Sequence, residues 1–231
     1  MIPLRDNIPS RRTPLVTYAL IAANVLVYVL VQPGAGTRAG LLFTLEWGLV
    51  PADLLGAEPR FPHPVPVSWT AITSMFLHGS FFHILGNMWY LWLFGDNVED
   101  VMGRARFAVF YFLCGAAAAA AQVMADPTSR VPMVGASGAI SGVLGGYLLL
   151  YPHARILTLV PIVFFIQIIE IPAIIVLGLW FAAQVFNGLG AISFHGGGVA
   201  WFAHIGGFLA GMALVQIFRV RQRPRTWDGW R

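Results

Sequence analysis

Residues 131–151 read VPMVGASGAISGVLGGYLLLY, and this stretch decides the fold. In a chain with 58% hydrophobic and 10% charged residues, its apolar part reads as a membrane helix that is too short. From Ser137 to Tyr151 it is about 22 Å long, against a hydrocarbon core of about 30 Å. Irregular backbone at membrane depth is tolerated only beside protein or a water-filled cavity. We therefore expect residues 131–136 to enter the membrane and Ser137 to lie at the bottom of such a cavity.

The rest of the chain is typical of a polytopic membrane protein. Its mean hydropathy is +0.73, and its charged fraction of 10% compares with roughly 25% in a soluble domain. Apolar runs bounded by proline, glycine and charge predict an all-α bundle of six transmembrane helices, at about 15–31, 80–95, 105–124, 137–151, 162–187 and 200–219. Residues 32–79 read as a large, structured outer loop.

The 14 basic residues are all arginine, and they indicate an orientation. With the N-terminus inside, only Arg38, Arg60 and Arg130 lie outside, and the other eleven lie on the inner side. We therefore expect a cytoplasmic N-terminal segment (1–14), the membrane domain (15–219) and a basic cytoplasmic tail (220–231). In a chain this apolar, the arginines predict contact with a lipid bilayer and no binding of nucleic acid. The single cysteine, Cys114, excludes an intrachain disulfide and a cysteine metal site.

Three further polar residues are predicted at the depth of Ser137. His204 lies 15 residues before Arg219, the expected inner end of the last helix, which places it about 22 Å above the inner interface. His83 lies 13 residues before Asp96 and so about 20 Å up, with Asn87 one turn lower on the same face.

Small residues repeat at every fourth position on the fourth and sixth predicted helices. These are Gly138, Gly142 and Gly146, and Ala203, Gly207 and Gly211. Such faces let two helix backbones approach closely in a membrane. They would bring the hydroxyl of Ser137 and the imidazole of His204 within hydrogen-bonding distance.

A hydroxyl beside an imidazole predicts acyl-transfer chemistry. Ser137 would act as the nucleophile and His204 as its base. The first N–H groups of the helix, with His83 and Asn87, would stabilise the oxyanion. No acidic residue is predicted at the depth of His204, so the arrangement is a dyad, and Ser141, one turn deeper, is a second candidate nucleophile.

Three motifs resemble those of the rhomboid intramembrane proteases: GASG at 135–138 (GxSG), AHIGG at 203–207 (AHxxG) and HILGN at 83–87 (HxxxN). The resemblance implies a serine endopeptidase that cleaves transmembrane segments of single-span or polytopic proteins near the outer membrane face. It places Gly135 and Gly138, with His83 and Asn87, in the oxyanion and substrate-binding part of the site. It implies no metal or other cofactor and leaves the oligomeric state open. The compact core suggests a prokaryotic cytoplasmic membrane.

Two features depart from that family, and two other functions stay open. Thr70 follows Trp69 where the family often has arginine, and Ser141 stands where an aromatic residue often packs on the histidine. A catalytically silent rhomboid-like protein that binds transmembrane helices is one alternative, although such proteins typically lack the serine or the histidine. A small transporter is the other, because polar groups at midplane are expected there too; the chain shows no evident internal repeat.

Overall fold

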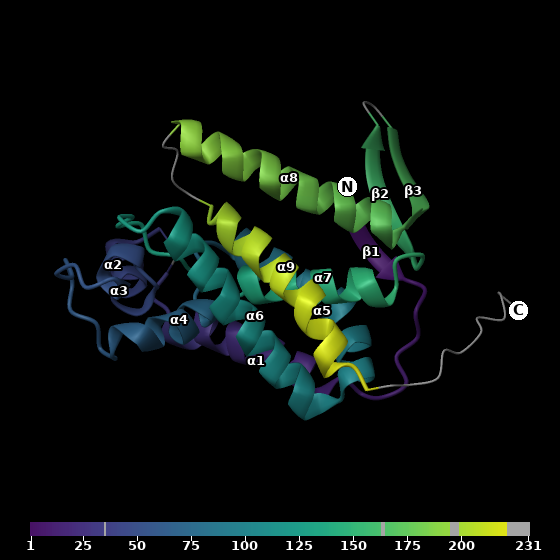
Figure 1. The fold of residues 1–231 in the computed structure, drawn as a ribbon, viewed down its shortest axis with the longest axis horizontal. Coiled ribbons are helices and arrows are strands. Elements are labelled where there is room, and N and C mark those ends of the chain that lie inside the picture. Colours follow the sequence, from purple (N-terminus) through teal and green to yellow (C-terminus); the bar gives the residue numbers. More distant parts are fainter. Residues whose placement is uncertain (35, 163–164, 195–198, 221–231) are drawn as a thin grey trace, which may run out of the picture.

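The computed structural model describes residues 1–34, 36–162, 165–194 and 199–220. Most of them are helical (Figure 1). The long helices are α1 (Leu15–Leu26, continued by a π-helical turn over Val27–Val31), α5 (Phe81–Met102), α6 (Arg104–Ala125), α7 (Ser137–Leu150), α8 (Ala173–Phe194) and α9 (Trp201–Phe218). The short helices are α2 (Arg38–Trp47), α3 (Pro51–Leu54) and α4 (Thr70–Thr73), with 3-10 turns at Val67–Trp69 and Ser74–Phe76. The predicted tail 220–231 lies outside the described residues except for Val220.

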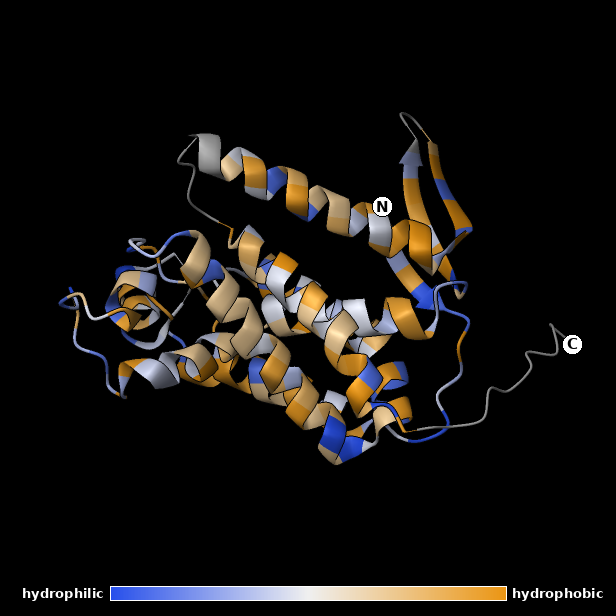
Figure 2. Cartoon of the chain, viewed as in Figure 1, coloured by the Kyte–Doolittle hydropathy of each residue, from blue (hydrophilic) through white to orange (hydrophobic). Residues whose placement is uncertain are grey.

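Three of these helices are long and apolar enough to cross a membrane, namely α6, α8 over Ala173–Ala191, and α9. The segments Leu15–Val31 and Ser137–Leu150 are apolar but shorter. The long helix α5 carries Asp96, Glu99 and Asp100 in its second half. Figure 2 shows the apolar residues along the long helices. The chain is therefore a mostly helical membrane protein, while the count of six spans stays a prediction.

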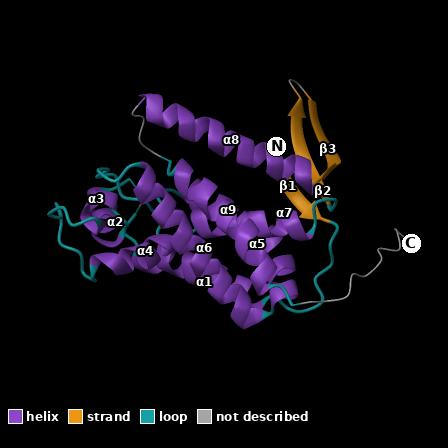
Figure 3. Cartoon of the chain, viewed as in Figure 1, coloured by secondary structure: helices purple, strands orange, loops and turns teal. Residues whose placement is uncertain are grey.

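The predicted fifth helix, 162–187, is wrong at its start. Residues Arg155–Ile162 (β2) and Phe165–Pro172 (β3) pair as antiparallel strands, and the helix α8 begins only at Ala173. The N-terminal strand β1 (Ile2–Asp6) pairs with β2, which gives a sheet of order β1-β2-β3 (Figure 3). The run is rich in β-branched residues and contains Pro161, which favour strands and disfavour a helix interior.

Helix α7 lies in the centre of the bundle, where α5, α6 and α9 contact it. Its contact with α9 is close because glycines face backbone. A methyl group added at Gly207 would overlap the carbonyl oxygen of Gly138, and one at Gly211 would overlap that of Gly142. The predicted small-residue faces are thus confirmed as the α7–α9 contact.

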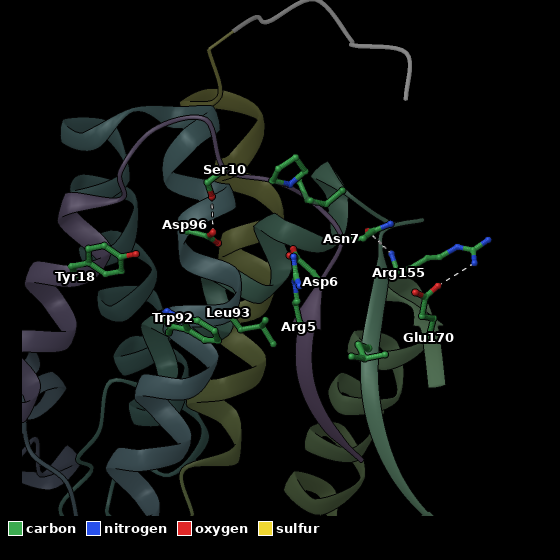
Figure 4. A pocket seen from close by; sticks show the side chains of 13 residues that line it. Arg5, Asp6, Asn7, Ser10, Tyr18, Trp92, Leu93, Asp96, Arg155 and Glu170 are labelled. Atoms are coloured by element: carbon green, nitrogen blue, oxygen red, sulfur yellow. Dashed lines mark hydrogen bonds and ion pairs between the residues drawn. The ribbon is translucent and has the colours of Figure 1, made fainter. Parts of the chain in front are cut away.

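The end of the bundle that carries the sheet is joined to the N-terminal segment by polar contacts (Figure 4). A cavity of about 550 Å³ lies there. Asp6 accepts hydrogen bonds from Tyr147 of α7 at 2.5 Å and from Asn97 of α5 at 3.0 Å. Ser10 donates to Asp96 at 2.5 Å. The segment before α1 is therefore fixed to α5 and α7 at several points.

Helix α5 continues beyond the predicted end of the second helix at about residue 95, and Glu99 in this extension is only 3% exposed. Its carboxylate accepts from the backbone N–H groups of Val16 and Thr17 and from the Thr17 hydroxyl, at 2.8–3.0 Å. A residue of α5 thus caps the N-terminus of α1, where a negative charge is favoured.

The opposite end carries the short helices and turns between Arg38 and Phe76. This segment, within the predicted outer loop 32–79, is hydrogen-bonded through Ala52 and Ser74 to Ser129 and Gly135. Leu49 and Met133 form an isolated β-bridge. Asp53, 8% exposed, contacts His63 at 3.2 Å and Arg130 at 3.3 Å. The side chain of His63 is buried in this network. These contacts hold the stretch that leads into α7.

Candidate active site

Ser137 and His204 meet where α7 and α9 approach each other. The Oγ atom of Ser137, the first residue of α7, lies 2.9 Å from Nε2 of His204, in the first turn of α9. This distance is that of a hydrogen bond. A cavity of about 440 Å³ opens beside the pair, and both residues are half-buried in its wall.

The approach to α7 depends on Gly135. Its φ of +121° lies in a region that side chains rarely adopt, and its N–H donates to the carbonyl oxygen of Ser74 at 2.9 Å. A methyl group at this position would lie 2.7 Å from Nε2 of His83 and 3.5 Å from Nδ2 of Asn87. Glycine therefore allows the chain to turn into α7 directly against two residues of α5.

His83 and Asn87 line the same cavity as Ser137 and His204. Asn87 is 8% exposed, and its Nδ2 is buried with no hydrogen-bond partner. A buried donor without a partner is costly, so this amide is available to a ligand oxygen in the cavity. The structure thus brings together all six residues that the sequence selects: Ser137, His204, His83, Asn87, Gly135 and Gly138.

Ser141 also lines the cavity but is engaged elsewhere. Its Oγ donates to the carbonyl oxygen of Ser137 at 2.6 Å, one turn back along α7, and the residue is 1% exposed. The aromatic contacts to His204 come instead from Trp180 of α8, with ring centres 6.0 Å apart, and Trp201 of α9, at 6.2 Å. These two rings contact the histidine in place of the aromatic residue that the family often has at the position of Ser141.

Gln184 of α8 is a site residue that sequence reasoning missed. Its Oε1 lies 2.8 Å from Nδ1 of His204, on the side of the ring opposite Ser137. The predicted dyad follows from the absence of an acidic residue at this depth and takes no account of a neutral amide. An amide in an apolar helix, four residues after Trp180, was the available signal.

A family model described as "Rhomboid domain" matches residues 66–221, about two thirds of the chain. The chain belongs to the rhomboid family. It is 29% identical to "Rhomboid protein 1, mitochondrial" of Saccharomyces cerevisiae over 84% of this chain and 51% of that protein. It is 32% identical to "Rhomboid protease GluP" of Bacillus subtilis over 87% of this chain and 35% of that protein.

Shorter matches agree with this membership. "Putative rhomboid protease YdcA" of Bacillus subtilis is 39% identical over 35% of this chain and 40% of that protein. This rhomboid chain therefore spans between about a third and a half of the length of these relatives. The relatives include mitochondrial and bacterial proteins.

Proposed function

We propose that this rhomboid is an intramembrane serine endopeptidase in which Ser137 is the nucleophile and His204 its general base. The observation that carries the proposal is the 2.9 Å contact between Ser137 Oγ and His204 Nε2, in the wall of a cavity. A serine hydroxyl becomes nucleophilic when an adjacent base takes its proton. Both residues come from helices whose glycine faces hold them at this distance.

The cavity also supplies groups for the oxyanion. As Ser137 Oγ attacks a peptide carbonyl carbon, its proton passes to His204 and negative charge develops on the carbonyl oxygen. The first N–H groups of α7 have no partner within the helix, and the Asn87 amide has a free donor. His204 then gives its proton to the leaving amine. In the second half of the reaction, His204 takes a proton from the water that attacks the acyl-enzyme and returns it to Ser137 Oγ as the acid product leaves.

The proposed substrates are transmembrane segments of single-span or polytopic proteins. A membrane helix shields its amides, so cleavage requires local unwinding, which glycine and proline favour. In the topology indicated by the arginines, six helices span the membrane between residues 15 and 219, both termini are cytoplasmic, and the loop 32–79 and the cavity lie toward the outer face. The membrane would be a prokaryotic cytoplasmic membrane.

The test is cleavage of a single-span substrate by the purified chain in detergent, together with labelling by a fluorophosphonate probe. Ser137→Ala and His204→Ala should each abolish cleavage, and Ser137→Ala should abolish labelling. Ser141→Ala is the matched control, because it removes a hydroxyl that bonds only to backbone; it should retain most activity. Asn87→Ala should lower kcat by about 10²-fold or more through loss of an oxyanion donor.

Two results would count against the proposal. Full activity of Ser137→Ala, with loss in Ser141→Ala, would move the nucleophile one turn along α7. If the wild-type chain cleaves none of a panel of substrates and is not labelled by the probe, these two absences would favour a silent rhomboid that binds transmembrane helices.

A further inference from the structure

Gln184 contacts the proposed base in a defined orientation. It is 7% exposed, and its Oε1 lies 2.8 Å from Nδ1 of His204. Its Nε2 donates to the carbonyl oxygen of Trp180 at 3.2 Å. The opposite orientation of the amide would place Oε1 against that carbonyl oxygen, two acceptors facing each other. The contact to Trp180 therefore directs the amide oxygen toward His204.

This orientation determines which ring nitrogen of His204 carries the proton. An amide oxygen can only accept, so Nδ1 must be the donor and must hold the hydrogen. In a neutral imidazole, Nε2 then has the free lone pair. Nε2 is the atom that faces the Ser137 hydroxyl, and a lone pair there is what a general base needs.

We propose that Gln184 is a positioning residue that holds His204 in the tautomer and ring orientation needed to accept the proton of Ser137. The inference rests on the proposed function, and it adds a neutral amide as a third member, a hydrogen-bond acceptor, to the expected dyad of serine and histidine. The described part of the chain offers His204 no carboxylate partner. A carboxylate at this depth in a membrane would be costly to bury, whereas an amide sets the tautomer without a charge.

Two substitutions of nearly equal size separate positioning from packing. Gln184→Met keeps volume and removes the acceptor, while Gln184→Glu keeps an acceptor oxygen at the same position. If Gln184 positions His204, Gln184→Met should lower kcat on the order of 10²-fold, as for a displaced catalytic group, and should leave KM within about threefold of wild type. Gln184→Glu should retain at least about a tenth of wild-type kcat. A packing role predicts the reverse order, because methionine packs well and a buried carboxylate does not.

The matched control is Asn187→Leu, which replaces an exposed amide on the same helix and should leave kcat unchanged. All variants are compared by their thermal unfolding in detergent. The inference is overturned if folded Gln184→Met retains kcat within about threefold of wild type, or if Gln184→Glu is no more active than Gln184→Met.

A second measurement does not require catalysis. The ¹⁵N chemical shifts of the imidazoles, six histidines in all, report the tautomer of each ring, and the spectrum of His204→Ala assigns the signal of His204. Wild type should show the form protonated on Nδ1, and Gln184→Met should lose this preference. If wild type neither cleaves substrates nor takes the probe, the proposed function fails, but this spectrum still decides the contact. A ring protonated on Nε2 in wild type overturns the inference even if cleavage is found.

Discussion

Replacing Gly207 by alanine tests whether the α7–α9 contact sets the geometry of the proposed catalytic pair, Ser137 and His204. The added methyl would overlap the carbonyl oxygen of Gly138 and lie 3.0 Å from its carbonyl carbon, whereas carbon atoms in contact lie about 3.5–4.0 Å apart. The helices must therefore separate by about 1 Å. Because His204 lies one turn before Gly207 and Ser137 adjoins Gly138, the 2.9 Å contact would lengthen to nearly 4 Å and cease to be a hydrogen bond.

We expect Gly207→Ala to lower kcat about 10²-fold. Overpacking costs about 1–3 kcal/mol, and the higher helix propensity of alanine returns up to about 1 kcal/mol, so the free energy of unfolding should fall by no more than about 3 kcal/mol. The assay is substrate cleavage in detergent alongside unfolding in SDS. Gly178→Ala on α8 is the control, because a methyl there meets no atom within 4 Å. Activity of Gly207→Ala within about threefold of Gly178→Ala would refute the reasoning, since a displacement of 1 Å should cost far more.

Three further predictions concern other contacts. Burial raises the pKa of Asp6 from 3.8 to about 6, so the folded chain favours the protonated carboxyl. Protonated Asp6 therefore contributes at most about 3 kcal/mol to the free energy of unfolding. This contribution is complete below about pH 4 and is lost as the pH rises through 6. The unfolding midpoint of wild type should fall between pH 4 and 7 by more than that of Asp6→Asn, and equal slopes would contradict this. Glu99→Ala should lower the free energy of unfolding by about 3 kcal/mol, because it leaves the N-terminus of α1 without an acceptor; Glu99→Gln should cost less in the same denaturation assay, and equal losses would argue against the cap. Gly135→Ala combines the strain of positive φ, about 1–2 kcal/mol, with a clash against His83. It should remove cleavage while the chain still folds. Turnover at the wild-type rate would contradict the close approach of Gly135 to His83.

The candidate site was largely predictable because its geometry follows from helix length and small residues. Each residue of helix adds a fixed rise, so counting from the inner ends gives Ser137 and His204 the same depth. Glycine at Gly207 then allows the two backbones to meet. The estimate for His83 started from Asp96, which lies within α5 and not at its end. Its place in the cavity is nevertheless as expected, because His83 and Asn87 share one helix face.

The β-hairpin was not predictable from periodicity. Residues 159–166 are continuously apolar, and such a run has no polar residues to show whether its period is 2 or 3.6, so the sequence favoured a helix from residue 162 onward. Pro161, Pro172 and the β-branched residues between them were the opposing signal. The end of the second helix was predicted too early, at about residue 95, because charged residues usually mark a helix end. Here the charge of Glu99 is satisfied by the N-terminus of α1.

The position of Gln184 connects the proposed catalysis to the placement of α8. The helix packs mainly on α9 and exposes apolar residues such as Leu179 and Phe186 on its other side. Two of its residues reach His204, Gln184 by a hydrogen bond and Trp180 by a ring contact. An outward displacement of α8 would remove both at once and leave Nδ1 without its acceptor, whereas Ser137 and His204 would still be held together by the glycines of α7 and α9. Proximity of the proposed pair and correct protonation of its base thus depend on different helix contacts. A variant that loosens α8 should therefore lower the rate without separating the side chains of Ser137 and His204.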